Sequence, residues 1–339
     1  MPDNPIAVQL VDAVLSDFPD HQPGTRPVHT IGIGVQGYFE ASEVARNYTI
    51  AAHFQGQRVP VTVRFSNGTG SPVEHDGWSD VRGMATRFHL GDDVATDLIA
   101  MTLAEFFAPS VDAFLQFSRA ARPARQQRES PWQKILDMLC LKQPLPDPMP
   151  GQMASGAAGM LAFANQHRFA QMAVFQAGSI GAPVSYVRAA YHAVHTFILT
   201  GPDHVRRPVR FSWEPIAGVR TTDPTAPPVD CYLHQELKDR LQRQPATFRL
   251  VMSIGEIGDA YADPTRQWPG KRCRVFMGTL TLTTVPEDQE IFCEKISFNP
   301  CRLTPGIDIS DDPILQARRD AYEVSRLRRG GQSCPFAAG

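Results

Sequence analysis

Short stretches in which apolar and polar residues alternate at every second position run along much of the chain. The clearest is residues 59–66, where apolar side chains occupy one face and Arg64 and Ser66 lie on the other. This period of two is typical of half-buried strands. The pattern also predicts strands over residues 28–40, 194–200, 208–214, 247–254, 274–285 and 290–298.

Helical patterns gather in the middle of the chain and near its end. They cover residues 41–54, which Ser42 would begin, then 111–122, 131–142, 156–177 and 311 to about 327. Ser310 is the expected N-cap of the last helix. Because strands lie on both sides of the helical block without regular strand–helix alternation, the predicted fold class is α+β around an antiparallel sheet or barrel.

Composition narrows the range of partners. The chain has 339 residues, 42% of them hydrophobic, and a formal net charge of -2. This balance gives no electrostatic argument for binding nucleic acid or an anionic membrane, and no apolar run approaches the roughly 20 residues of a membrane span. The acidic N-terminus is not a secretory signal. We therefore expect a cytoplasmic protein whose six scattered cysteines are free thiols.

One glycine pattern, Gly32-Ile33-Gly34-Val35-Gln36-Gly37, matches a nucleotide-binding motif. A dinucleotide-binding turn also needs an acidic residue about 20 positions later, but residues 50–58 contain neither Asp nor Glu. Glycine within a strand more often allows a bend or a close backbone approach. We interpret these glycines in that second way.

His29 is the first candidate for chemistry. As a strand residue it would share a face with Ile31, Ile33 and Val35, where a histidine is usually a core residue. The alternative is an acid–base histidine in a dry pocket, with Ser66 of a neighbouring strand holding its second nitrogen.

Tyr322 is the second candidate, because Arg318 lies one helical turn before it. A neighbouring guanidinium favours the ionised phenol, which is a ligand suited to ferric iron. A surface helix with a solvated arginine face would show the same spacing. If they converge, Arg26, Arg64 and Arg329 would bind carboxylates bidentately. Two interpretations fit the aromatic residues Phe106, Phe107, Phe114 and Phe117: they belong to the hydrophobic core, or they form a flat apolar wall against a porphyrin.

Several motifs occur in one order along residues 26–330. They are Arg26-Pro27-Val28-His29, Val63-Arg64-Phe65-Ser66, Asp80-Val81-Arg82-Gly83-Met84-Ala85, Asp97-Leu98 leading to Phe106-Phe107 and Phe114, and Leu315-Gln316-Ala317-Arg318 with Tyr322. Together they resemble the haem catalase family, in particular its short catalase-related peroxidases. The resemblance implies a catalase-like antiparallel β-barrel core with surrounding helices and a haem b buried in the barrel domain.

The resemblance also implies a division of the chain and a set of roles. Residues 1–25 would be a short N-terminal arm, residues 26–330 a single haem-binding domain and residues 331–339 a C-terminal tail. Tyr322 would be the axial iron ligand, supported by Arg318, and His29 the distal acid–base residue, oriented by Ser66. Arg26, Arg64 and Arg329 would bind the haem propionates. The pocket would be lined by Val28, Phe106 and Phe114, and Asp80 would lie in the access channel.

One departure from the family pattern bears on activity. Full catalases carry an asparagine beside the distal histidine, and Met101 takes its place here, followed by Thr102. Methionine donates no hydrogen bond, whereas Thr102 would do so if it points inward, which makes it a third candidate catalytic residue. We expect a peroxidase that reduces hydrogen peroxide or organic hydroperoxides through a ferryl intermediate, with an unidentified small electron donor and weak or no catalase activity.

Other functions remain open at this point. They are a haem catalase that dismutates hydrogen peroxide, a hydroperoxide isomerase of allene oxide synthase type, a haem-binding or haem-sensing protein without turnover, and a protein with no cofactor. The isomerases carry Thr where Val28 stands, which argues against the second. Because full catalases use longer terminal segments in tetramer packing, we expect a homodimer or a monomer.

Overall fold

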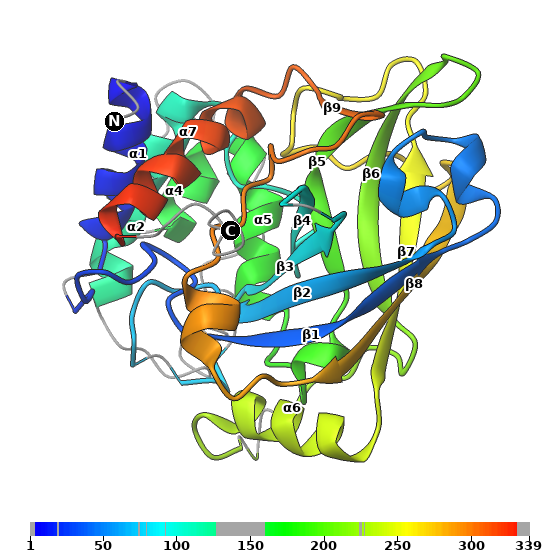
Figure 1. The fold of residues 1–339 in the computed structure, drawn as a ribbon. Coiled ribbons are helices and arrows are strands. Elements are labelled where there is room, and N and C mark those ends of the chain that lie inside the picture. Colours follow the sequence, from blue (N-terminus) through cyan, green and yellow to red (C-terminus); the bar gives the residue numbers. More distant parts are fainter. Residues whose placement is uncertain are drawn as a thin grey trace.

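A closed barrel forms the centre of the molecule. The structure, a computed structural model, describes residues 4–126 and 160–330, apart from residues 19, 74, 79, 92, 224, 225 and 227. Its antiparallel sheet has the order β4-β3-β2-β1-β8-β7-β6-β5-β9, and pairing between β4 and β5 closes the first eight strands into a barrel (Figure 1). The strands are β1 (Gly32–Ala41), β2 (Arg58–Asn67), β3 (Arg82–His89), β4 (Ala95–Met101), β5 (Tyr191–Thr200), β6 (Arg206–Pro215), β7 (Ala246–Ile254), β8 (Arg274–Thr284) and β9 (Ile307–Ile309).

Most of the described helices gather on one side of the barrel, at the left in Figure 1, while α6 (Tyr232–Arg243) lies below it. None of them is both long enough and apolar enough to cross a membrane. The N-terminal α1 packs on α7 through Ala7, Val11 and Val324. The gathered helices are α1 (Pro5–Leu15), α2 (Val111–Gln126), α4 (Met160–Gln166), α5 (Arg168–Ser179) and α7 (Pro313–Arg328).

Strand β2 separates the barrel core from the candidate site. Val61, Val63 and Phe65 belong to the buried hydrophobic core that fills the barrel. Successive side chains of a strand point to opposite faces, so Arg64 and Ser66 point out of the barrel. Both are nevertheless buried, because other segments cover this outer face. The site is therefore built against the outside of the barrel wall.

The structure confirms the α+β class with an antiparallel barrel and most predicted elements. The strand predicted over residues 59–66 is β2, the helix predicted over 111–122 lies within α2, and the last helix is α7. Asp312, not Ser310, is the N-cap of α7, because its carboxylate accepts the amides of Ile314 and Leu315. The helix predicted over 131–142 lies outside the described residues.

Three predicted elements are wrong in part. Residues 41–54 form two 3-10 turns, η1 (Ala45–Asn47) and η2 (Ala52–Phe54), and between them the Thr49 hydroxyl donates to the Gly306 carbonyl. Residues 290–298 contain a π-helical turn, η4 (Glu290–Glu294), instead of a strand. The predicted helix over 156–177 is divided at His167 into α4 and α5.

One side chain binds three backbone carbonyls of residues 290–298. Arg26 donates hydrogen bonds from Nη2 to the carbonyls of Cys293, Glu294 and Ile296, at 3.1, 3.2 and 2.9 Å. A strand would offer these carbonyls to a neighbouring strand. Among the cysteines of the described chain, the thiols of Cys231, Cys273, Cys293 and Cys301 are free, as expected.

Candidate functional site

His29 lies just before β1, with a left-handed backbone angle φ of 58°. Its Nδ1 is 3.0 Å from the Ser66 hydroxyl, so the structure brings together the two residues that were paired in the sequence prediction. The prediction that His29 shares the apolar strand face is wrong, because its backbone has already left the strand. The ring lies over Gly83 of β3, where an added Cβ would be 2.9 Å from the imidazole.

The surroundings of His29 keep its imidazole neutral at pH 7. Burial lowers the pKa of His29 to about 4; the Asp80 carboxylate opposes this shift, while the charges of Arg64 and Arg318 add to it. Asp80 is held in place by the amides of Gly68 and Val81. A neutral imidazole can accept a proton from a bound hydroperoxide.

Three arginines from distant parts of the chain converge on Glu294. Arg64 lies 3.1 Å from the Glu294 carboxylate and Arg26 lies 3.6 Å from it, while Arg329 donates to the Glu294 carbonyl at 3.0 Å. Arg64 also donates to the carbonyls of His29 and Thr30. This arginine cluster therefore lies directly beside His29.

The arginine cluster carries more positive charge than its one carboxylate can neutralise. Burial, together with Arg64 and Arg329, lowers the pKa of Arg26 to about 9, despite the opposing charge of Glu294. The Nε atom of Arg26 is also buried without a hydrogen-bond partner. Three guanidinium groups and one carboxylate leave two positive charges, which fits the two propionates of a haem.

The glycines of β1 allow neighbouring groups to approach the strand closely. A Cβ on Gly32 would lie 2.4 Å from the Arg64 guanidinium carbon, and one on Gly34 would lie 2.5 Å from the Cβ of Cys293. At Gly37 a Cβ would lie 2.0 Å from a carbonyl oxygen of β8. The interpretation of the glycine pattern as close backbone approach is confirmed.

A chain of hydrogen bonds leads to Tyr322 on α7. Arg318 donates to the Tyr322 oxygen from Nη2 at 2.6 Å, and its Nη1 lies 2.7 Å from Nε2 of His195. The other ring nitrogen of His195 lies 2.6 Å from the carboxylate of Asp312. Because Arg318 can only donate, His195 accepts at Nε2 and donates from Nδ1 to Asp312. The phenol oxygen of Tyr322 is therefore held as an acceptor beside a positive charge, as an iron ligand requires.

His195 and Asp312 were not predicted as site residues. Burial lowers the pKa of His195 in spite of its bond to Asp312, so the imidazole stays neutral between Asp312 and Arg318. Asp312 has two roles, since one carboxylate oxygen caps α7 and the other meets His195. The indication in the sequence was the pair Asp311-Asp312 before α7, but acidic residues are equally expected at the start of a helix.

An aromatic cluster lies between the strands and α7. The rings of Phe106 and Phe114 lie 6.2 Å apart, and Phe106 lies 5.9 Å from the ring of His195. Met101 packs with the same hydrophobic group, which also includes Ile314 of α7. Val28, immediately before His29, is partly buried.

The Met101 position is opposite Gly83 in the β3–β4 pairing. Since His29 lies over Gly83, Met101 stands beside the histidine, with no hydrogen-bond donor at its tip. The hydroxyl of Thr102 accepts the Arg82 amide at 3.0 Å, and the Thr102 amide donates to the Arg82 carbonyl at 2.9 Å. Thr102 is thus turned toward the β3 backbone.

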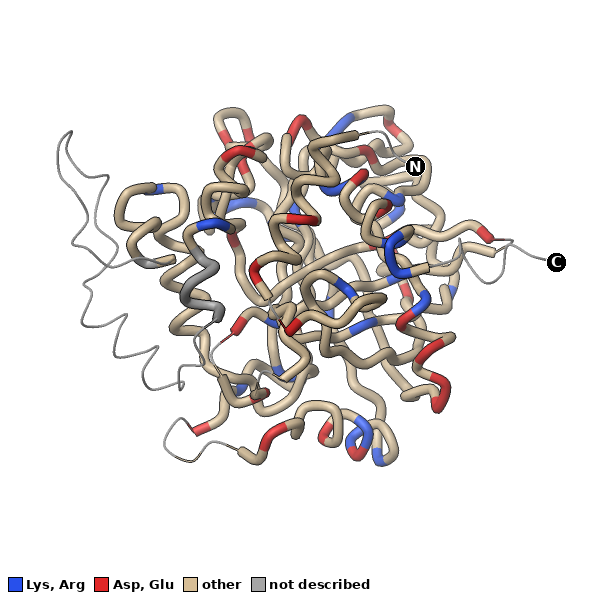
Figure 2. The backbone as a smooth tube through the Cα atoms, turned by 90° about the vertical axis from the view of Figure 1, so that its left-hand side faces the viewer, with Lys and Arg blue, Asp and Glu red and all other residues tan. Residues whose placement is uncertain are grey.

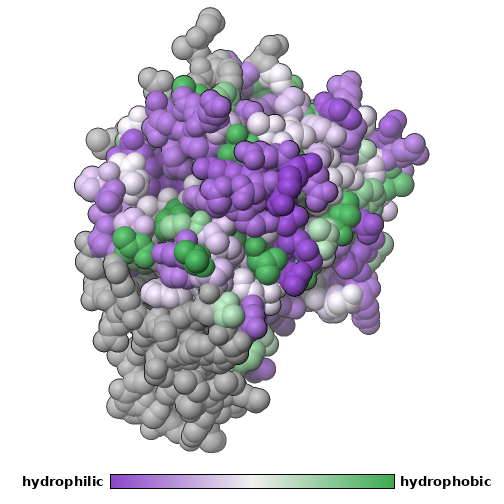
Figure 3. All heavy atoms as spheres, turned by 90° about the horizontal axis from the view of Figure 1, so that it is seen from below, coloured by the Kyte–Doolittle hydropathy of each residue, from purple (hydrophilic) through white to green (hydrophobic). Residues whose placement is uncertain are grey.

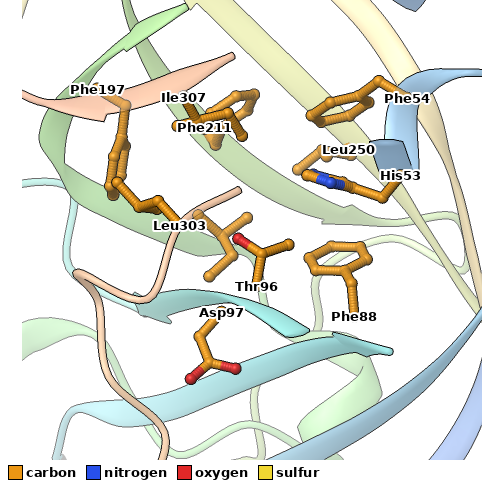
Figure 4. A pocket seen from close by; sticks show the side chains of 11 residues that line it. His53, Phe54, Phe88, Thr96, Asp97, Phe197, Phe211, Leu250, Leu303 and Ile307 are labelled. Atoms are coloured by element: carbon orange, nitrogen blue, oxygen red, sulfur yellow. The ribbon is translucent and has the colours of Figure 1, made fainter. Parts of the chain in front are cut away.

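A small cavity inside the barrel is separate from this site (Figure 4). It has a volume of about 20 Å³ and is lined by side chains that include His53, Phe88 and Leu250. This is room for a single water molecule. The Asp97 carboxylate points away from the aromatic side chains there (Figure 4) and binds Arg87 instead.

Comparison with known proteins identifies the family of the chain. A model of the family described as Catalase matches residues 8–144 and 148–335. A catalase-related peroxidase of Mycolicibacterium paratuberculosis is 32% identical over 335 residues, covering 96% of this chain and 97% of its relative. A catalase-related peroxidase of Synechococcus elongatus is 29% identical, with 90% and 84% covered.

Longer relatives share the same region. Catalase-2 of Bacillus subtilis is 27% identical, covering 95% of this chain but 48% of its own length. A crystal structure of a fungal catalase superposes with a TM-score of 0.72 at 21% identity, covering 94% of this chain and 61% of that one. The extent of these matches and the arrangement of the barrel lead to one conclusion: the chain belongs to the catalase family.

Proposed function

We propose that this protein is a haem b peroxidase that reduces hydrogen peroxide or organic hydroperoxides with electrons from an external donor. Its family identifies an oxidoreductase that acts on peroxide, and family and fold imply a haem cofactor. The observation that carries the finer proposal is Met101, which stands beside His29 where full catalases have an asparagine.

The residues present suit a haem. Tyr322, with Arg318 donating to its oxygen, would ligate the iron, and the propionates would neutralise Arg26, Arg64 and Arg329. Phe106, Phe114 and Val28 would contribute to the pocket wall. When bound, the haem supplies the redox chemistry that accepts an oxygen atom of the peroxide and takes up electrons.

His29 would move the proton. With Nδ1 bonded to Ser66, Nε2 is the nitrogen that accepts the hydroperoxide proton and returns it to the leaving oxygen. The pKa of His29, lowered to about 4, keeps this nitrogen unprotonated before the reaction. The complete reduction converts ROOH, two electrons and two protons into ROH and water.

Dismutation requires a hydrogen-bond donor beside His29, which Met101 does not provide. A second hydrogen peroxide must be oriented as the reductant, and a side-chain hydrogen-bond donor would do this. Met101 lacks a donor, and the Thr102 hydroxyl, which keeps its own proton, is held at the β3 backbone as the acceptor of the Arg82 amide. We therefore propose that electrons come mainly from another molecule and that catalase activity is weak or absent.

The test is a substitution that restores the missing donor. Met101→Asn should raise the ratio of oxygen evolution from hydrogen peroxide to oxidation of the donor guaiacol by about tenfold, which corresponds to roughly 1.4 kcal/mol of stabilisation in the transition state for oxidation of the second peroxide. An oxygen electrode and absorbance measure the two rates. Met172→Asn, at an exposed position of α5, is the control. Oxygen evolution by the unaltered protein that outpaces guaiacol oxidation would contradict the proposal.

A further inference from the structure

A groove runs along the outside of the barrel wall, beyond the arginine cluster. Its volume is about 690 Å³, within the range of small-molecule sites. The groove is formed by β1, β2, the β3–β4 hairpin, the end of β8 and η4. Its apolar lining comprises Tyr38, Pro60, Val94, Ile291, Phe292 and Ile296.

The groove and the arginine cluster share two structural elements. On β2, the outward side chains are Ser66 at His29, Arg64 in the arginine cluster and Thr62 in the groove. Each step of two strand residues covers about 7 Å. The short π-helical turn η4 places Glu294 against the arginines and Ile291 in the groove. A ligand in the groove would therefore lie next to the site where the propionates would bind.

The chemistry of the groove favours an uncharged ligand. Arg87, a buried cation in its lining, donates to Asp97 through two hydrogen bonds of 2.8 and 2.9 Å and to the Ser297 carbonyl, and Asp97 also pairs with Arg302, so the donors of Arg87 are engaged within the protein. His89 is neutral, because burial and the Arg87 charge lower its pKa. Asp93 at the rim would repel an anion.

One polar pair interrupts the apolar surface. The Thr62 hydroxyl lies 2.9 Å from Nε2 of His89, and both side chains line the groove. Such a pair offers a hydroxyl group of a ligand both donor and acceptor capacity. Apolar walls with a few polar groups are typical of sites that bind aromatic molecules.

We propose that this groove binds the reducing donor as an uncharged phenol, with its ring between Tyr38, Pro60 and Phe292 and its hydroxyl at Thr62 and His89. This inference rests on the proposed peroxidase function. Each phenol gives up one electron and one proton and becomes a phenoxyl radical. Two phenols and one hydroperoxide therefore yield two phenoxyl radicals, one alcohol and one water.

The first experiment measures binding without turnover. Guaiacol is added to the haem-loaded protein in the absence of peroxide, and its dissociation constant is obtained by ligand-observed NMR. The ferric iron should also shorten the relaxation times of the bound guaiacol protons. 1,2-Dimethoxybenzene, which lacks the hydroxyl, should bind several-fold more weakly.

Variants at the mouth of the groove locate the site. Val94→Arg and Ile291→Arg change side chains that are 54% and 43% exposed, so folding should be preserved. Each should weaken guaiacol binding about tenfold and raise the KM for guaiacol while leaving kcat/KM for the hydroperoxide unchanged. Val219→Arg, at a position 63% exposed outside the groove, is the matched control.

Thr62→Val tests the hydroxyl contact, because it preserves shape and removes the hydroxyl group. It should abolish the preference for guaiacol over 1,2-dimethoxybenzene. Guaiacol binding that is unaffected by Val94→Arg and Ile291→Arg would overturn the proposal, as would the absence of binding at millimolar concentration. If a self-association of the protein is lost in these variants, the groove is an interface between copies instead.

These outcomes are distinguishable from failure of the proposed function. A protein that binds guaiacol in the groove but never oxidises it would contradict the peroxidase function while supporting the site. A protein that oxidises guaiacol with a KM indifferent to Val94→Arg would retain the function and contradict the site.

Discussion

At the scale of the residue, His53 shows what burial does to a histidine with no evident polar partner. Its ring lies between those of Phe54 and Phe88, with centroids 4.1 and 4.6 Å away (Figure 4). The Nδ1 atom is buried without a hydrogen-bond partner. Burial lowers the pKa of His53 to about 3, so the folded protein holds this side chain neutral.

This burial should make the protein sensitive to acid. Below pH 6.5 the unfolded chain binds a proton at His53 that the folded barrel does not bind until about pH 3. The free energy of unfolding should therefore fall by about 2 kcal/mol from this group between pH 7 and pH 5, and urea titrations at the two values measure it.

His53→Gln should remove most of this difference. Phe54→Leu is the control, because it loses packing in the same place without removing a titratable group, and it should destabilise equally at both values. An unchanged pH dependence in His53→Gln would show that His53 is not the responsible group.

Sequence patterns predicted some of the residue pairs of the candidate site but not others. Arg318 and Tyr322 are one helical turn apart, so local spacing was enough to bring them together. The pairing of His29 with Ser66 was predicted from their placement on neighbouring segments and from the family resemblance. His195 and Asp312 are separated by 117 positions. No local period links them, and only the closed barrel brings β5 to the start of α7.

At the scale of the element, the outer face of the wall formed by β1, β2 and β3 is shaped by glycines. Gly32 admits the guanidinium of Arg64, Gly34 admits Cys293 of η4, and Gly83 admits the ring of His29. The absence of side chains at these glycines therefore leaves the space that the site residues occupy on the barrel wall. Pattern analysis did not predict β3 and β4, because the polar residues Thr86 and Thr96 occupy buried positions on the core face and weaken the hydrophobic alternation.

Gly83→Ala tests this account of the wall. The added methyl would lie 2.7 Å from the Ser66 hydroxyl and 2.9 Å from the His29 ring, so the histidine must move. Peroxide reduction should slow by at least about tenfold, while the circular dichroism spectrum and haem content stay the same. Gly270→Ala, where an added Cβ meets nothing within 4 Å, is the matched control and should behave like the unaltered protein. Normal peroxide reduction by Gly83→Ala would contradict the placement of His29.

At the scale of the molecule, the site joins segments from both ends of the described chain. His29 precedes β1, Arg64 lies on β2, Glu294 on η4 and Tyr322 on α7 (Figure 1). We propose that residues 26–330 form one domain around this site, with residues 1–25 as an arm whose helix α1 packs on α7. A ligand that contacts all these segments should stabilise the whole fold, because binding energy adds to the free energy of unfolding.

Haem loading should therefore raise the melting temperature, by about 5 °C or more at saturating haem. Haem dimethyl ester should stabilise less, because its esterified propionates cannot neutralise the arginine cluster. Calorimetry of both complexes measures the difference. Equal stabilisation by the two ligands would show that the arginines do not hold propionates.

The surface bears on the state of assembly. Acidic and basic residues are interspersed along the described chain (Figure 2), and the face seen from below is mainly hydrophilic, with hydrophobic side chains in small groups (Figure 3). We propose a monomer or homodimer. Light scattering should give one or two times 37.4 kDa, and a mass near four times that value would contradict the proposal.

The barrel closes through one residue pair, Met101 of β4 with His192 of β5. Neighbouring strands elsewhere in the barrel pair over several residues, as β2 and β3 do from Val61 to Asn67. We expect local opening of the barrel to begin at this seam between β4 and β5, because the fewest backbone hydrogen bonds must break there. Amide hydrogens along β4 and β5 should thus exchange with solvent sooner than those of β7 and β8. Met101, which stands beside His29, lies on that seam, so opening of the barrel should first disturb the proposed site.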